Sequence, residues 1–553
     1  MSEKIQEIKA ATHLREKPLF FSFAVQREYP NKEIRILIRW KRCFLALLLL
    51  SIIGWTALTS TLYFILKYKQ NIETVTLTNA LLLQRSEIRR KIGDYNIQES
   101  TKTSNYRDAT RLWHFGVARS PGNLKGRRLI AEDYELIRKR PAIAADYLIE
   151  GLKHGGLEDA EYVKRLIQVL LRNQMDEKIQ EIADTYLPKE PQLTEINRLL
   201  ALGAASAYYH RGGFDLAEDY LINYNLMELV DGLLISSRIS WDRGNRTAAI
   251  VKLEQTLNRF PKSDLLLAQL STYYRETGDM DKARRFALLR NIENSSSHRP
   301  KLALLYLYEQ TADNERLETE IERMFEQFGT DKDALTEFSN FAAKTGNVSL
   351  AKRIQQHALE NEFDVGVFAL LFLEAHIFNR DYVQALNLME GLVEEKAEWL
   401  TKYWSVFNGL RSIAAFETKR PDLGEVYLQN FLKETRQTPY NYLNLANQFF
   451  TTERLSQARE VLTVAYRQFP KNQKILAELI KVELDLGNTE KLSELLNRLL
   501  KMRRPSVDLL TKAYQKLSSD RFIFTQNRST LLLQIRAILR ENDKSQSLLE
   551  TSL

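Results

Sequence analysis

The sequence predicts an all-α protein in which one membrane-spanning helix precedes a long series of repeated helix pairs. Three observations support this prediction. Glycine (21) and proline (12) are scarce in 553 residues, whereas good helix formers such as leucine, glutamate and lysine are plentiful. A run of 24 residues near the N-terminus carries no charge. Further along, the chain contains two similar segments, FPKSDLLLAQLST and FPKNQKILAELIK, which begin 209 residues apart.

The first 42 residues form a predicted basic tail. They hold ten lysines and arginines against five acidic residues, and residues 85–140 hold fourteen against seven. The whole chain carries +8, so the remainder is slightly acidic. This gradient disfavours nucleic acid as the main partner, because such binders carry a basic stripe along their working face. It fits a chain that starts near anionic lipid headgroups, although solvated helix faces are an equally simple interpretation.

Residues 43–66, CFLALLLLSIIGWTALTSTLYFIL, predict a transmembrane helix, because about 20 apolar residues suffice to cross a bilayer. They follow 42 other residues and no small-residue cleavage motif, so we expect a retained anchor rather than a signal peptide. The fifteen residues before the run carry five lysines and arginines, and the fifteen after it carry two. This bias predicts a cytoplasmic N-terminus and an extracytoplasmic remainder, with a bacterial inner membrane as the favoured setting.

A spacing of 34 residues runs through the middle of the chain. Polar turns recur at this interval, with one slip of five residues, at Gly244, Gly278, Ala312, Gly346, Arg380, Lys419, Glu453 and Gly487. Five residues after each turn a second helix opens at Ala249, Ala283, Leu317, Ala351, Ala385, Gly424, Ala458 and Leu492. Most of these residues are small, which lets two antiparallel helices approach closely. The pattern extends upstream through Ala217 and, more weakly, through Ile179 and Ala144 to Ala109.

This arrangement resembles the tetratricopeptide repeat (TPR), a 34-residue helix-turn-helix with small, aromatic, glycine, alanine and proline residues at fixed places. The best unit is LAQLSTYYRETGDMDKARRFA, residues 267–287, and its matching positions are Leu270, Tyr274, Gly278 and Ala283. The resemblance departs from the family at Leu317, Arg380, Lys419 and Leu492. It implies an α-solenoid of about 9–12 degenerate repeats, because each unit buries its apolar face only by stacking on a copy of itself.

The predicted domain order follows from these features. A basic cytoplasmic tail (1–42) precedes the transmembrane helix (43–66), a juxtamembrane stalk (67–104), the TPR-like solenoid (105–505), and C-terminal capping helices with a tail (506–553). The stalk is expected either to continue the membrane helix or to pair as a short coiled coil.

The sequence contains no recognisable catalytic motif, so we expect a non-catalytic protein without cofactor or metal. The seven histidines are scattered and form no H-E-x-x-H, and no P-loop, G-x-G-x-x-G or G-x-S-x-G occurs. Cys43 is the only cysteine, which excludes an intramolecular disulfide and a cysteine-based zinc site.

The resemblance implies a membrane-anchored scaffold or adaptor that holds protein or peptide partners in the solenoid groove, in an envelope assembly, secretion or polysaccharide system. Two alternatives stay open: a cytosol-facing TPR receptor for protein import, and a non-catalytic regulator of a membrane enzyme. The oligomeric state is not predicted.

In the TPR family the first helix of each pair faces the concave side. The resemblance therefore implies partner-binding candidates of hot-spot types, namely Tyr209, Arg238, Trp241, Arg275, Tyr306 and Asn340. For each of them, packing between neighbouring units is the competing interpretation. Where the slip breaks the repeat, Trp399, Tyr403 and Trp404 are the next candidates.

Overall fold

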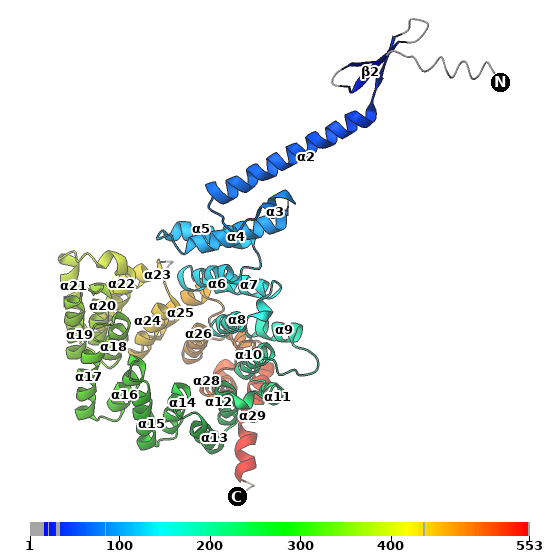
Figure 1. The fold of residues 1–553 in the computed structure, drawn as a ribbon. Coiled ribbons are helices and arrows are strands. Elements are labelled where there is room, and N and C mark those ends of the chain that lie inside the picture. Colours follow the sequence, from blue (N-terminus) through cyan, green and yellow to red (C-terminus); the bar gives the residue numbers. More distant parts are fainter. Residues whose placement is uncertain (1–15, 20–21, 29–33, 83, 435–436, 551–553) are drawn as a thin grey trace. The chain divides into compact units, whose positions relative to one another are not determined.

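The computed structural model describes residues 16–19, 22–28, 34–82, 84–434 and 437–550, and residues 1–15 of the predicted tail lie outside them. The chain divides into two compact units, residues 1–173 and 174–553. The described part is almost entirely helical, as predicted (Figure 1). The boundary between the units falls inside the range predicted for the solenoid.

The first unit begins with a small sheet and continues with helices. In chain order its elements are β1 (Glu16–Leu19), β2 (Ala24–Glu28), β3 (Ile34–Ile38), α2 (Trp40–Phe64), η2 (Ile65–Lys69), α3 (Leu77–Leu81), α4 (Arg85–Ser100), α5 (Tyr106–Arg119), α6 (Leu124–Glu132), η3 (Asp133–Ile137), α7 (Pro141–Leu152), η4 (Gly156–Glu158) and α8 (Ala160–Arg172).

The sheet lies within the predicted basic tail, and the overall composition, which favours helix, does not indicate it. Strand β2 is central and pairs antiparallel with β1 and with β3. The sequence of β3, IRILI, is rich in the β-branched residues that suit strands. Pro18 lies in the edge strand β1, where a missing N–H is tolerated. Local sequence therefore overrides the average composition here.

Helix α2 contains the predicted transmembrane run. Together with η2 it forms one helix, Trp40–Lys69, that is long and apolar enough to cross a membrane. Its apolar side chains are open to the surroundings, with Phe44 exposed by 70%, Leu47 by 66% and Leu50 by 65%. This confirms the predicted apolar helix by its length and composition.

The chain turns back after η2 rather than continuing as a straight stalk. Asn71 ends the helix with a φ of +54°, and Ile72 and Val75 are buried in a small apolar cluster. Helix α3 returns alongside α2, where the Trp55 Nε1 donates a hydrogen bond to the Leu81 carbonyl at 2.9 Å. Burial of these apolar side chains in the fold-back explains why the segment does not extend α2.

The second unit consists of consecutive helix pairs followed by a terminal pair. Its elements are α9 (Asp176–Tyr186), α10 (Glu195–Arg211), α11 (Phe214–Asn223), η5 (Leu226–Glu228), α12 (Val230–Asp242), α13 (Arg246–Arg259), α14 (Asp264–Glu276), α15 (Met280–Glu293), α16 (His298–Gln310), α17 (Asn314–Phe328), α18 (Lys332–Lys344), α19 (Val348–Glu360), α20 (Val365–Phe378), α21 (Tyr382–Glu394), α22 (Leu400–Glu417), α23 (Pro421–Leu432), α24 (Pro439–Thr451), α25 (Leu455–Gln468), α26 (Gln473–Leu486), α27 (Leu492–Leu500), α28 (Val507–Ser518), η6 (Asp520–Phe522) and α29 (Arg528–Glu550).

The predicted turn positions are left-handed residues between the two helices of a pair. A positive φ occurs at every one of them, whether glycine or not, namely at Gly244, Gly278, Ala312, Gly346, Arg380, Lys419, Glu453 and Gly487. The upstream positions Lys139, Gln174 and Gly212 continue the series. At Gly278 the hydrogen bonds Gly278 N to Arg275 O (3.2 Å) and Asp279 N to Tyr274 O (2.9 Å) form a Schellman motif. The predicted register is therefore confirmed.

The small residues that open the second helices are packing positions. Ala249, Ala283 and Ala351 have no exposed surface. The Ser237 hydroxyl donates to the Ala249 carbonyl at 3.0 Å, and the Ser271 hydroxyl donates to the Ala283 carbonyl at 2.9 Å. A small side chain on one helix and a hydroxyl on the other thus bring the two backbones together, as the spacing predicts.

The slip of five residues is absorbed before and within α22. This first helix has 18 residues, whereas the preceding first helix, α20, has 14. Lengthening a helix by about one turn keeps the apolar face in phase, because a turn takes 3.6 residues. The repeat therefore resumes at Lys419 without loss of packing.

The second unit closes on itself through the linker between α27 and α28. Arg503 forms a two-pronged ion pair with Asp176, both distances being 2.7 Å, across 327 residues of chain. The Arg504 N–H donates to the His210 carbonyl at 2.8 Å, and the Arg504 guanidinium lies 4.6 Å from the centre of the Phe214 ring. Figure 1 shows the last helices of this unit, in orange and red, beside its first. We call residues 501–506 the closing linker.

Candidate partner-binding site

Three pockets in the second unit are lined mainly by the first helices of the pairs. The closing pocket lies among α10, α12, the closing linker and α28. The middle pocket lies among α14, α16 and the end of α18, with two residues of α15. The inner pocket lies among α18, α20, α22 and α24, with one residue of α23. Five of the six predicted site residues line one of these pockets.

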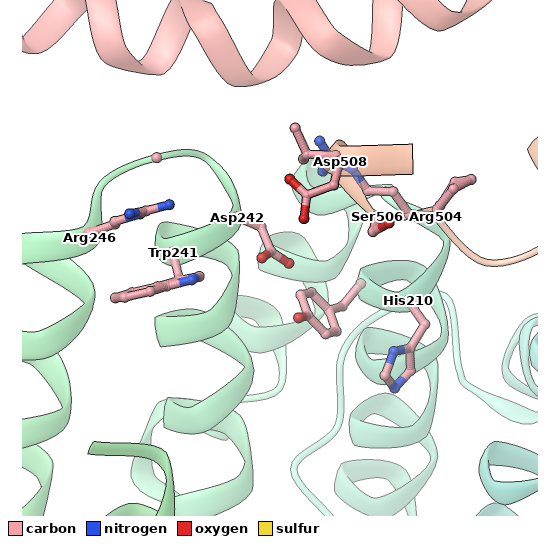
Figure 2. Close-up of a pocket in the computed structure, with 11 residues that line it drawn as sticks. His210, Trp241, Asp242, Arg246, Arg504, Ser506 and Asp508 are labelled. Carbon is pink, nitrogen blue, oxygen red and sulfur yellow. The ribbon is translucent and has the colours of Figure 1, made fainter. Parts of the chain in front are cut away.

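The closing pocket has a volume of about 520 Å³ and combines aromatic and charged groups. Figure 2 shows Arg246 lying over Trp241 on one side, and Arg504, Ser506 and Asp508 on the opposite side. The guanidinium of Arg246 is 5.3 Å from the centre of the Trp241 ring. The pocket exists because the closing linker brings residues from the end of the unit onto its first helices.

Burial sets the charge state of the groups in this pocket. It lowers the pKa of His210 to about 4, and the neighbouring Arg503 acts in the same direction. It also raises the pKa of Asp242, against the opposing effect of a hydrogen bond from Tyr209. His210 is therefore neutral at physiological pH.

Tyr209 and Trp241 line the closing pocket and also pack within the solenoid. The Trp241 ring stacks on Tyr273 of the next pair, with ring centres 3.7 Å apart and an angle of 4°. Tyr209 stacks on Phe214 at 6.0 Å and holds Asp242 by a hydrogen bond. Each side chain thus presents one part to the pocket and uses another for packing between units.

Arg238 lines none of these three pockets. Its Nε and Nη2 donate to the Oε1 of Gln269 on the neighbouring first helix, at 3.1 and 3.0 Å. For this residue the contacts match the competing interpretation, packing between units.

The middle pocket, about 570 Å³, contains two of the predicted residues, Arg275 and Tyr306. Arg275 is exposed and forms no ion pair with any residue that the structure describes. Tyr306 is 38% exposed and rests edge-on against Phe341, with ring centres 4.9 Å apart. Lys344 also lines the pocket, together with Arg290, which is paired with Asp264, and the exposed Glu309. This pocket thus offers cationic donors and an aromatic ring to an acidic or carbonyl-rich ligand.

Asn340 lines the inner pocket and accepts a hydrogen bond from the Tyr440 hydroxyl at 3.3 Å, across 100 residues of chain.

The three alternative candidates in the slipped segment differ in their contacts. Tyr403 donates to the Asp364 carboxylate at 2.8 Å, and Trp399 packs edge-on against Phe407. Only Trp404, 42% exposed, keeps a large free surface.

The closing linker and its neighbours His210 and Asp242 escaped prediction. The 34-residue period places each residue only within its own repeat. It therefore carries no information on contacts between repeats that are hundreds of residues apart. The sequence MRRPSV offers a weak hint, because two arginines before a proline interrupt the repeat. Among the described residues, no group of three or more His, Cys, Asp or Glu side chains is arranged to hold a metal.

The chain was compared with family models, curated proteins and solved structures. No family model matches the chain, and no curated protein does. Among solved structures, the chain is similar to the TPR domain of P58(IPK), with 14% identity over 74% of this chain and 99% of that one, and a TM-score of 0.20.

Two further structures are similar at the same level. A tetratricopeptide repeat protein from Parabacteroides merdae is 14% identical over 56% of this chain and 98% of its own, with a TM-score of 0.26. The structure of Naa15/Naa10 bound to HypK-THB is 15% identical over 90% of this chain and 80% of its own, with a TM-score of 0.28. Because these scores are low, the fold class rests on the helix pairs, their period and their turns: this is an all-α, TPR-like solenoid preceded by one long apolar helix.

Proposed function

We propose that the chain is a non-catalytic scaffold that binds an extended segment of a protein partner along the first helices of its solenoid. The observation that carries this proposal is that three pockets are lined mainly by first helices, and that α18 contributes to both the middle and the inner pocket. An extended segment that runs along the first helices can place successive side chains in such pockets.

The middle pocket supplies the strongest contact in this proposal. Arg275 and Tyr306 belong to the residue types that dominate binding hot spots, and both present free surface beside Lys344. The cost of ordering them on binding is small for the tyrosine, which rests on Phe341 in the free protein. We expect this pocket to hold an acidic or carbonyl-rich part of the partner.

We further propose that α2 and η2 anchor the protein in a membrane, with the N-terminus in the cytoplasm and the solenoid on the other side. Two facts support this: the exposed apolar surface of Trp40–Lys69, and the excess of lysine and arginine before the apolar run. A bacterial inner membrane, and a role in envelope assembly, secretion or polysaccharide synthesis, are the settings that this orientation favours.

The scaffold proposal is tested by partner recovery after chemical cross-linking in cells. The full chain should co-purify with a partner that the chain lacking residues 105–505 does not recover. The double variant Arg275→Ala/Tyr306→Ala should lose that partner while keeping its helicity and melting temperature. The matched variant Leu289→Ala/Ile292→Ala removes exposed apolar side chains from the second helix α15, and should keep it. Equal recovery by both double variants would contradict the proposal.

The orientation is tested with one introduced cysteine. Cys43 is the only native cysteine, so Cys43→Ser with Ser295→Cys yields a chain with one thiol, in the exposed turn between α15 and α16. A membrane-impermeant maleimide should label this thiol in intact cells. Labelling only after lysis would reverse the orientation and favour the cytosol-facing receptor.

A further inference from the structure

We propose that the inner pocket binds one cationic side chain of the partner, an arginine or a lysine, with Glu374 as its counter-ion. This inference rests on the proposed function, since it names the chemistry of one contact that the partner makes. The pocket has a volume of about 240 Å³, enough for one long side chain.

Glu374 is a buried carboxylate held in place by two amides. It lies on α20 and is 6% exposed. Its Oε1 accepts hydrogen bonds from the Asn444 Nδ2 at 2.7 Å and from the Gln448 Nε2 at 3.1 Å, both on α24. These bonds fix one oxygen and leave the other lone pairs of the carboxylate available.

No cation forms an ion pair with this carboxylate in the described part of the solenoid, and Lys344 acts on it only from beyond ion-pair distance. Among the residues that the structure describes, no lysine, arginine or histidine lies within ion-pair distance of Glu374, whereas the buried Glu320 pairs with Lys301 at 3.4 Å and Glu483 with Arg459 at 2.8 Å. Burial accordingly raises the pKa of Glu374. A buried charge is normally paired, because an unpaired one is costly.

A second acceptor in the same lining is also unused. Gln448 is 2% exposed, and its Oε1 has no hydrogen-bond partner, because its Nε2 is turned toward Glu374. A buried acceptor without a donor is destabilising until a donor arrives. A guanidinium or ammonium group brings several donors and one positive charge, and so satisfies both oxygens.

The rest of the lining fits the stem of such a side chain. Half of the 16 lining residues are apolar or glycine, among them Val367, Leu370, Val406, Leu410 and Leu445. Lysine and arginine combine an apolar stem with a charged head. A calcium or magnesium site normally draws on several carboxylate oxygens, and Glu374 is the only carboxylate in this lining. The occupant is therefore an organic cation on an aliphatic stem.

The test uses the purified full-length protein in detergent and three small probes: n-butylguanidinium, n-butylammonium and the neutral butyramide. Ligand-observed NMR should show saturable binding of at least one cation, about tenfold or more tighter than that of butyramide. Glu374→Gln keeps the shape and hydrogen-bonding capacity and should weaken cation binding by a similar factor. Glu326→Gln, the same change at an exposed residue of the second helix α17 that lines none of the three pockets, should leave it unchanged.

A second measurement does not depend on how well the variant folds. Dicyclohexylcarbodiimide, an apolar reagent, modifies buried protonated carboxyl groups. Mass spectrometry of the unaltered protein should show Glu374 protected by the bound cation and unprotected by butyramide. Equal protection by all three probes, unchanged affinity in Glu374→Gln, or no saturable cation binding below about 10 mM would overturn the inference.

The outcome separates this inference from the proposed function. Cation binding at Glu374, together with unchanged partner recovery in Arg275→Ala/Tyr306→Ala, would overturn the proposed function and leave the pocket a cation site. Loss of the partner in that variant, without cation binding at Glu374, would overturn only the inference.

Discussion

At the scale of single residues, the left-handed turn positions carry the register of the whole array. Glycine occupies half of the eight predicted positions, and Ala312, Arg380, Lys419 and Glu453 adopt the same conformation with φ values of 53° to 63°. A side chain in this region costs roughly 1 kcal/mol or more relative to glycine. The degenerate repeats thus tolerate strain that the neighbouring packing overcomes.

Exchange at these turns should change stability in opposite directions. Gly278→Ala should lower the free energy of unfolding by about 1 kcal/mol, because a Cβ at Gly278 meets no atom within 4 Å and only the backbone is strained. Arg380→Gly should raise it by a similar amount. Gly391→Ala, in the interior of α21 and equally free of neighbours, is the control and should stabilise. Urea denaturation of the full chain measures all three, and destabilisation by Arg380→Gly would refute the account of the turns.

The buried His210 should make stability depend on pH. Its pKa is lowered to about 4 in the folded protein, below the ordinary value near 6.5. The unfolded chain therefore binds more protons between these values, so stability is full above about pH 6.5 and falls as the pH drops toward 4, by at most about 3 kcal/mol. His210→Gln should lose this part of the pH dependence. Parallel pH profiles for the variant and the unaltered protein would contradict the prediction.

At the scale of elements, sequence reasoning reaches what repeats and fails where contacts are unique. The helix pairs, the turns and the small packing residues recur every 34 residues. Each of these features is therefore supported by several copies of the repeat, and a chance match in one copy has little weight. The five-residue slip was visible, but its absorption into α22 was not, because helix ends depend on local capping. The strand β3 was missed because five residues barely alter a composition dominated by helix formers.

The candidate site shows the same division. The period of the repeat predicted Arg275, Tyr306 and Asn340 as site residues, and all three line pockets. It also predicted Arg238, whose guanidinium donates a hydrogen bond to Gln269 instead. Side-chain contacts of this kind depend on the particular neighbour and not on the period. Glu374 was not selected, because its importance comes from Asn444 and Gln448, 70 and 74 residues away.

The closing linker should be held mainly by one ion pair. The side chains of Asp176 and Arg503 are 4% and 17% exposed, so Asp176→Asn removes the charge of one partner of a largely buried ion pair and should cost about 3–5 kcal/mol. Adding Arg503→Met should restore part of this loss. Glu177 follows Asp176 in α9, and Glu177→Gln breaks an exposed pair with Arg211 of α10, which should change stability by no more than about 0.5 kcal/mol. Hydrogen exchange of α9, α10, α27 and α28 locates the effect, and equal losses in both single variants would contradict it.

At the scale of the whole molecule, the apolar helix and the solenoid differ in the surfaces that they expose. Trp40–Lys69 exposes apolar side chains that water disfavours, while the second unit buries its own apolar faces between pairs and closes through Arg503. What the second unit leaves open are pockets of mixed charge along its first helices. These two features are the ones on which the proposed function, capture of a partner at a membrane, rests.

The most direct test of this account is a photo-crosslinking scan of the full chain in cells. A benzophenone amino acid is placed in turn at Arg275 and Tyr306 on first helices, and at Leu289 and Ile292 on the second helix α15, all of them exposed. We expect one shared protein adduct from Arg275 and Tyr306, and none of that mass from Leu289 or Ile292. The same adduct from Leu289 and Ile292, with none from Arg275 and Tyr306, would show that the first helices are not the binding surface.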